Sequence, residues 1–386
     1  MNSLRISNDI IKIFLLFLSW RIVLIIILIL SIKFVPLAYL DRFLGGGPTN
    51  YHLSQEVFSW ANFDGEHYLS IAVFGYKGLE QAFFPTYPML ISFFAKPFSV
   101  NLFSAFLSST IIGLLVSNSA FVLALILLYE LILLDFSKKI AFTAVILLLI
   151  FPTSFYFGAL YSESLFLLLS LLCFYFARKK RFFLASFFGF LSSATRIFGV
   201  LLLPAILIEI YQQKEKFSKF FWIFLIPLGL VAYMLYQYLT VGDPFAFYHL
   251  QKVVGEQHQS GLTLLPQVYY RYIKMLIVVD SHNVIYQTIF LEFIIGIVFF
   301  LLPIYGYFKK IRLSYLVYAM LGFLTPTIPG SFSSIPRYVI VFFPCFIALA
   351  IFWNSLSRIP KFIYLGLSIA ALCLETTLFL RGYWVA

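Results

Sequence analysis

Two carboxylates, Asp64 and Glu66, follow the first long apolar stretch of this chain, in the run Trp60-Ala-Asn-Phe-Asp-Gly-Glu-His-Tyr-Leu-Ser-Ile-Ala-Val-Phe-Gly-Tyr76. Ionisable side chains close to lipid are costly unless they are paired or hydrated, so their presence needs a specific reason. A carboxylate held in a cleft can take a proton from a hydroxyl nucleophile. This run is therefore the first candidate for a catalytic site.

The spacing of the run allows two interpretations of Asp64. If residues 60–73 form an interfacial helix, one helix face carries a carboxylate, an imidazole and a phenol above an apolar base, namely Trp60, Asp64, His67, Tyr68 and Ile71. A shorter helix with Gly65 as its first residue would instead make Asp64 an N-cap. Spacing alone leaves a general base and a cap both open. Glu66 lies off the shared face, so we expect it to be solvated or structural.

Glu163 lies in Ala159-Leu-Tyr-Ser-Glu-Ser-Leu-Phe166, at the start of a very apolar segment. At that depth an unpaired carboxylate costs roughly 2.5 kcal/mol or more, which indicates a paired or functional group. A carboxylate in the first turn of a helix is also stabilised by the helix dipole. Both interpretations stay open at this stage.

Two arginines stand in apolar surroundings, Arg196 in Ser192-Ser-Ala-Thr-Arg-Ile-Phe-Gly199 and Arg337 in Ser333-Ser-Ile-Pro-Arg-Tyr338. Arginine keeps its charge and can bind phosphate with two parallel hydrogen bonds. The pair would suit a phosphate whose lipid tail stays in the membrane. The alternative is a pair of structural salt bridges to Glu163 or Asp64.

The composition places the chain in a membrane. Of its 386 residues, 62% are hydrophobic and 11% are charged, whereas about 25% are charged in an ordinary soluble domain. There is too little polar surface to cover a water-soluble globule of this size. Because lipid offers no hydrogen bonds to the backbone, the apolar runs must be helices. We predict one all-α polytopic domain over residues 1–386, of about eleven transmembrane helices.

The predicted spans are 13–33, 111–134, 140–157, 160–177, 182–196, 198–212, 219–239, 285–307, 313–327, 338–354 and 362–381. If all of them cross, the basic clusters fall on one side, namely Lys138-Lys139, Arg178–Arg181, Lys214 to Lys219, Lys309–Arg312 and Arg358 to Lys361. Lys and Arg mark cytoplasmic loops. We therefore expect a cell-membrane protein with its N-terminus in the cytoplasm, and its C-terminus and active site outside.

The two long polar segments, 34–110 and 240–284, then become extracytoplasmic loops, and the first of them carries Asp64. The same charge pattern explains much of the net charge of +11 without a nucleic-acid surface. Phosphate-binding loops of the nucleotide-binding type are absent, and the predicted inner loops are too short to build a nucleotide-sugar site. The three cysteines, Cys173, Cys345 and Cys373, lie in apolar runs and are expected to pack rather than to form disulfides or a metal site.

Several blocks, in order, resemble the PIG-V-type mannosyltransferases, which are membrane glycosyltransferases of the GT-C class. The resembling blocks are Phe63-Asp64 with His67-Tyr68, Ile71-Ala72 and Gly75-Tyr76, then Ala82-Phe-Phe-Pro-Thr-Tyr-Pro88, Phe151-Pro-Thr-Ser154, Tyr161–Phe166, Ser193–Arg196 with Gly199, and Pro336-Arg-Tyr338 with Phe343-Pro344. Together they cover most of the chain. One departure is Phe63, because the family usually has Trp before the aspartate.

The resemblance implies a GT-C-like fold with interfacial helices in the first outer loop. It also implies a polyprenyl-phosphate-mannose donor and transfer of the sugar, with inversion, to a hydroxyl of a glycolipid or glycan. In that scheme Asp64 is the catalytic base. The charges of Arg196 and Arg337, not the resemblance, make these two candidate partners for the donor phosphate, and Glu163 a candidate for orienting the sugar or acceptor. His67, Tyr68 and Tyr87 complete the expected substrate-binding set.

Because arginines can stabilise a phosphate leaving group, we expect neither a metal nor a cofactor. The alternative function is a transporter or flippase of a polyprenyl-linked lipid. A transporter needs polar groups along its whole crossing, whereas most ionisable groups here gather at one predicted face.

Overall fold

The structure is a computed structural model that describes residues 8–38, 44–216, 219–254 and 263–385, and every described element is helical. Five segments are long and apolar enough to cross a membrane: α1 (Asn8–Phe34), α6 (Leu102–Leu133), the segment Phe220–Val241, α15 (Val284–Phe308) and α19 (Arg358–Leu380). Apolar side chains on the outer surface, such as Ile22 and Ile29 of α1, are exposed, as lipid-facing residues are. The all-α polytopic membrane fold is therefore confirmed.

Shorter apolar helices fill the rest of the bundle. They are α7 (Lys138–Leu149), α8 (Glu163–Arg178), α9 (Phe182–Ser193), α10 (Leu202–Gln212), α16 (Leu313–Thr327), α17 (Ile335–Val339) and α18 (Phe343–Ser355), with the 3-10 turns η4 (Ser154–Gly158) and η5 (Ile197–Leu201). Several spans that the sequence predicts as continuous helices are interrupted in the structure. The count of eleven crossings stays a prediction.

Prolines account for three of these interruptions, because the residue before a proline avoids the helical region. The span predicted at 140–157 stops at Leu149, just before Phe151-Pro152. The span at 219–239 is divided into α11 (Phe220–Ile223) and α12 (Leu228–Val241) around Pro227. The helix predicted at 338–354 starts later, at Phe343-Pro344, and Arg337 lies on a separate short helix before it.

The first long loop is helical, and its helices carry most of the predicted motif. They are α2 (Gly47–Leu53), α3 (Gln55–Phe58), η1 (Ser59–Ala61), α4 (Asp64–Phe74), η2 (Gly78–Ala82), α5 (Thr86–Ala95) and η3 (Lys96–Phe98). The loop is shorter than predicted, because α6 starts at Leu102, where Asn101 accepts a hydrogen bond from the Ser104 amide at 2.8 Å. The second loop contains α13 (Ala246–Val254) and α14 (Leu265–Val278); part of it, residues 255–262, lies outside the described residues.

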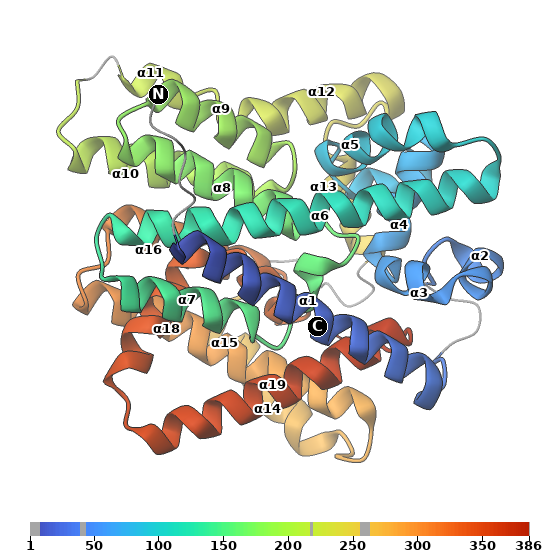
Figure 1. Ribbon diagram of the computed structural model, residues 1–386. Coiled ribbons are helices and arrows are strands. Elements are labelled where there is room, and N and C mark those ends of the chain that lie inside the picture. Colours follow the sequence, from blue (N-terminus) through green and yellow to red (C-terminus); the bar gives the residue numbers. More distant parts are fainter. Residues whose placement is uncertain (1–7, 39–43, 217–218, 255–262, 386) are drawn as a thin grey trace.

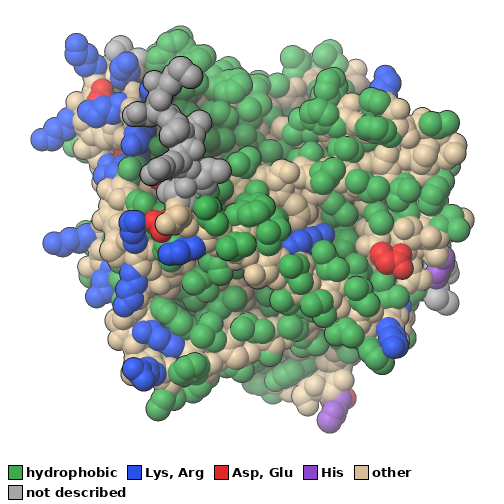
Figure 2. Space-filling model, in the orientation of Figure 1, with side chains coloured by type: hydrophobic (Ala, Val, Ile, Leu, Met, Phe, Trp, Pro, Cys, Tyr) green, Lys and Arg blue, Asp and Glu red, His purple; other side chains and the backbone are tan. Residues whose placement is uncertain are grey.

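The basic clusters lie at one end of the bundle. The connections from α6 to α7, α8 to α9, α15 to α16 and α18 to α19 all lie at the left of Figure 1, and Lys and Arg gather along the same edge in Figure 2. Ion pairs join several of these loops: Arg178 pairs with Asp135, and Arg312 lies 2.7 Å from the buried Glu209. The clustering that the sequence predicted is therefore present in three dimensions.

We expect this basic end to face the cytoplasm. In a chain with its own cysteines replaced, Lys309→Cys should react with an impermeant maleimide only after the cells are opened. Val100→Cys, which is 89% exposed in the loop that carries Asp64, should react in intact cells. Labelling of Lys309→Cys in intact cells would reverse the predicted orientation.

Candidate active site

Asp64 is the first residue of α4, and the residue before it has an unusual backbone. Phe63 has φ 57°, in the left-handed region that residues with a side chain rarely adopt. Its ring is held between those of Phe379 and Trp384, at centroid distances of 6.0 and 5.7 Å. The predicted helix over 60–73 therefore begins four residues later, and Trp60 lies on the preceding 3-10 turn. The N-cap position is occupied by Phe63, and Asp64 lies inside the helix with its carboxylate paired with Arg337, so the cap interpretation of Asp64 is wrong.

Asn62 fixes this turn to two distant segments. Its side-chain amide donates to the Phe379 carbonyl at 2.9 Å, and its own carbonyl accepts from the Tyr161 hydroxyl at 2.9 Å. A further bond joins the Leu160 amide to the Trp60 carbonyl at 2.9 Å. Asp64 is thereby placed next to the start of α8, about a hundred residues further along the chain.

A chain of four alternating charges runs through this region. The Arg337 Nη1 atom lies 2.6 Å from Asp64 Oδ2, and its Nε lies 3.8 Å from Glu163 Oε1. The same Glu163 oxygen lies 2.5 Å from Arg196 Nη1. The order is therefore Asp64, Arg337, Glu163, Arg196, from four separate segments. We refer to these four residues as the charged chain.

Burial differs along the charged chain. The Glu163 side chain is 1% exposed, and those of Arg337 and Arg196 are 9% and 12% exposed, whereas that of Asp64 is 28% exposed. Inside the bundle each charge needs an opposite charge, because burying a lone ion costs several kcal/mol or more. The pairing meets that need with two carboxylates and two guanidinium groups. Asp64 is the member that solvent or a ligand reaches most easily.

Two atoms of the charged chain keep hydrogen-bonding capacity. Glu163 Oε2 and Arg337 Nε are buried, and neither forms a hydrogen bond with any residue in the part of the chain that the structure describes. Buried polar atoms normally have partners, so such exceptions call for an explanation. A bound polar ligand or water would provide one.

Tyrosines surround the two arginines. The Arg337 guanidinium lies 5.0 Å from the Tyr338 ring centre, and 5.6 and 5.7 Å from those of Tyr156 and Tyr161. These are distances at which a ring face attracts a cation. Tyr68 of α4 reaches the same place, since its hydroxyl lies 2.9 Å from Ser162 Oγ, which is 3.4 Å from Arg196 Nη1. Burial raises the pKa of the Tyr68 phenol well above its usual range, so this hydroxyl stays protonated.

Arg337 is positioned by a short, well-fixed turn. Ser334, with φ 62°, precedes α17, and its amide donates to Glu292 Oε1 at 2.9 Å. Glu292 also accepts from the Tyr272 hydroxyl at 2.6 Å. On the other side, Thr153 donates to the Pro336 carbonyl at 2.6 Å. Glu292 was not among the predicted residues, although a carboxylate inside the apolar run 285–307 was a visible signal.

Arg196 is positioned by two backbone segments that pack closely, one on each side of it in the sequence. It precedes η5 in an extended conformation, and that turn packs against the end of α9. A Cβ added to Gly199 would lie 2.3 Å from the Ser193 amide nitrogen, so only glycine fits there. The block Ser193–Arg196 with Gly199 is therefore one packed unit that presents the guanidinium.

The other predicted residues lie around the charged chain rather than on it. His67 is half-buried and stacks on Phe83 at 4.7 Å. Tyr87 is fully buried, its hydroxyl bonded to Gly113 and Ser117 of α6, and its ring packs on Tyr68. Substrate contact by these two stays a prediction, and for Tyr87 the surrounding packing favours a structural role. The residues that the structure brings together are Asp64, Tyr68, Glu163, Arg196 and Arg337.

A third arginine and the cysteines can be placed as well. Arg21 of α1 donates to the Gly158 carbonyl at 3.1 Å and lies over the Trp60 ring, which is a structural role. Cys173 and Cys345 are buried and Cys373 is half-buried, all as free thiols. No group of three His, Cys, Asp or Glu residues that could hold a metal ion occurs within residues 8–38, 44–216, 219–254 and 263–385.

Comparison with known protein families identifies the group to which this bundle belongs. The family model described as Mannosyltransferase (PIG-V) matches residues 6–250, which is more than half of the chain. The chain belongs to the PIG-V mannosyltransferase family. This confirms the family predicted from the ordered motifs. The match includes Asp64, Glu163 and Arg196, and ends before Arg337. A search of curated proteins found no match.

Solved structures that resemble the chain include the oligosaccharyltransferase of Archaeoglobus fulgidus. Its form tethered with an acceptor peptide aligns at 14% identity and a TM-score of 0.45, and its apo form at 13% and 0.45. A third structure, AglB in complex with an inhibitory peptide and a dolichol-phosphate, aligns at 12% and 0.40. Each alignment covers 95% of this chain and 56% of the other, so the chain spans just over half the length of these proteins.

Glu66 offers a test of the electrostatics near Asp64. Burial raises the pKa of its carboxyl to about 7. A raised carboxyl pKa means that the folded state favours the protonated form, so this contribution to stability is present at low pH and is lost as the pH rises through about 7. Glu66→Gln, which cannot ionise, should raise the melting temperature relative to the parent more at pH 8.5 than at pH 5. An equal effect at both pH values would show that Glu66 ionises as if solvated.

Proposed function

We propose that this chain is an inverting glycosyltransferase that moves a hexose, with mannose as the first candidate, from a polyprenyl-phosphate sugar to an acceptor hydroxyl on a glycolipid or glycan. The observation that carries the proposal is the charged chain, in which a partly exposed carboxylate ends a buried series of two guanidinium groups and a second carboxylate. Membership of the PIG-V family supports the choice of sugar.

The arrangement supplies the two groups that such a transfer needs. The acceptor oxygen attacks the anomeric carbon, its proton passes to Asp64, and the bond from that carbon to the phosphate oxygen breaks. The polyprenyl phosphate leaves with the bonding electrons, and Arg337 and Arg196 stabilise its growing negative charge. Attack opposite to the leaving group inverts the anomeric centre. The arginines already supply positive charge, so we expect activity in the presence of a chelator.

Because of the salt bridge between Asp64 and Arg337, the donor binds before Asp64 can act as a base. Asp64 Oδ2 lies 2.6 Å from Arg337 Nη1, so this carboxylate oxygen is engaged by the guanidinium before the donor binds. A donor phosphate is a second anion, and it competes with Asp64 for the guanidinium. Donor binding then frees Asp64 to accept a proton from the acceptor. Asp64 can therefore act as a base only when the donor is bound. Glu163, held between both arginines, keeps them in place and offers Oε2 to a sugar hydroxyl.

The transporter alternative gains no particular support from the structure. The buried carboxylates Glu292 and Glu375 lie in the parts of α15 and α19 nearest the loops that hold the charged chain. These two carboxylates therefore lie near the charged chain, whereas the buried Glu209 at the basic end is neutralised by Arg178 and Arg312. A site near one end is what an enzyme with a surface site requires. We propose that this end is extracytoplasmic.

Asp64→Asn should abolish transfer and leave the protein folded. Loss of a general base lowers rates by about 10² to 10⁴-fold. Purified protein is incubated with polyprenyl-phosphate mannose or glucose and a membrane lipid extract as acceptor, and the release of polyprenyl phosphate is measured. Glu66→Gln, two residues away and outside the charged chain, is the matched control and should keep activity. A fully active Asp64→Asn would refute the role of this carboxylate, and lipid translocation without sugar transfer would favour the transporter.

Arg337 variants should separate charge from geometry. Arg337→Lys keeps one positive charge but loses the planar fork, and we expect a fall of about 10²-fold in the rate at saturating donor, typical of losing one transition-state donor. Arg337→Gln leaves the buried Glu163 with one cation fewer, so it should also unfold more easily, by roughly 3–5 kcal/mol. Normal donor turnover by Arg337→Lys, measured as phosphate-lipid release, would exclude Arg337 from the donor site.

A further inference from the structure

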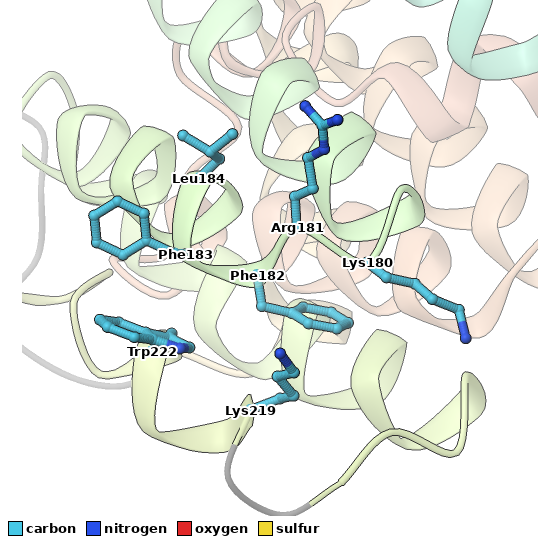
Figure 3. Close-up of a pocket in the computed structure, with 7 residues that line it drawn as sticks. All are labelled: Lys180, Arg181, Phe182, Phe183, Leu184, Lys219 and Trp222. Atoms are coloured by element: carbon cyan, nitrogen blue, oxygen red, sulfur yellow. The ribbon is translucent and has the colours of Figure 1, made fainter.

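Two surface cavities, of about 260 and 360 Å³, lie at the basic end of the bundle among the described residues, and neither contains a residue of the charged chain. The smaller one lies where the turn between α8 and α9 meets the start of α11 (Figure 3). Its lining combines three cations, Lys180, Arg181 and Lys219, with the rings of Phe183 and Trp222. Such a combination is suited to a ligand that is anionic at one end and apolar at the other.

Two of the three cations of this cavity have no ion-pair partner among the residues that the structure describes, whereas two arginines at the same end are neutralised by carboxylates. Arg178 and Arg312 are neutralised by Asp135 and Glu209. Lys180 pairs with Glu215 at 2.7 Å, although its side chain is 62% exposed. Arg181 and Lys219, by contrast, form no ion pair with any residue in the described segments. The cavity therefore carries two positive charges that the surrounding protein does not balance.

The apolar side of the cavity is open to lipid. Phe183 and Trp222 are 50% and 39% exposed, and their rings meet edge to face at 4.9 Å. In Figure 3 these rings lie together at the left, while Lys180 and Lys219 lie further to the right. Tryptophan favours the boundary between headgroups and acyl chains. The cavity thus lies where a membrane-spanning bundle meets the interface.

We propose that this cavity binds the headgroup of an anionic phospholipid in the leaflet at the basic end. Lys219 contacts the phosphate, and Arg181 adds a second positive charge on the other side of Phe182. Phe183 and Trp222 contact the first part of the acyl chains. Basic pockets between helices on the cytoplasmic side are suited to anionic headgroups. The site is separate from the charged chain and does not depend on the proposed sugar transfer.

The test measures lipid binding to the full-length protein in detergent by native mass spectrometry, with phosphatidylglycerol and phosphatidylcholine of the same acyl chains. Phosphatidylglycerol should bind more tightly. The double variant Arg181→Ala/Lys219→Ala should weaken its binding by about 30-fold, because each basic residue near an anionic lipid contributes roughly fivefold. The charge-preserving variant Arg181→Lys/Lys219→Arg should keep the affinity, which guards against a folding defect.

Lys309→Ala/Lys310→Ala is the matched control, because it removes the same charge at the same end from exposed residues outside the cavity. It should leave phosphatidylglycerol binding unchanged. An equal loss of phosphatidylglycerol binding in this control would show that only the overall charge of this end matters, which would overturn the proposal. Equal affinity for the two lipids would also overturn it. Displacement of phosphatidylglycerol by excess inorganic phosphate would show a phosphate site without a role for the lipid, and would also overturn it.

Discussion

The rest of the site depends on the contact between Arg337 and two carboxylates, Asp64 at 2.6 Å and Glu163 at 3.8 Å. Burying a guanidinium that is only 9% exposed destabilises the fold unless it has partners, because desolvation of an ion costs several kcal/mol. The pairing therefore fixes how α4, α8 and α17 meet. It also sets the chemistry, since the same contact restrains the carboxylate that is proposed to act as base.

The positions of these charges are fixed by backbone features that carry no charge themselves. Phe63 and Ser334, both with positive φ, precede the two helices that begin at Asp64 and Ile335. Each of these turns is tied to distant segments, one through Asn62 and the other through Glu292 and Thr153. Unusual backbone conformations of this kind persist only where the surrounding structure determines them, and they concentrate at functional sites.

Buried ion pairs also occur at the other end of the bundle, but there they have a structural role. Asp135, Arg178, Glu209 and Arg312 form a second network, in which Glu209 is fully buried and also accepts from Ser314 at 2.5 Å. There the charges join helix ends and are balanced by one another. In the charged chain, by contrast, Glu163 and Arg337 each keep an unused hydrogen-bonding atom, and Asp64 stays accessible. That difference separates a structural network from a candidate active site.

The sequence by itself determined the membrane class, the helical fold, the family and the clustering of basic loops at one end, because composition, apolar run length and charge spacing are local properties that lipid constrains strongly. It also indicated Asp64, Glu163, Arg196 and Arg337 as candidate site residues. It did not decide whether Asp64 is a base or a helix cap, or whether the arginines bind phosphate or form salt bridges. The helix breaks at Pro152 and Pro227 were missed although proline is a local signal. The role of Glu292 was missed because it depends on contacts with Tyr272 and Ser334, in other segments. Only the tertiary structure decided that residue 337 contacts residue 64, because a charge buried in the bundle must find its partner in space, whatever the distance along the chain.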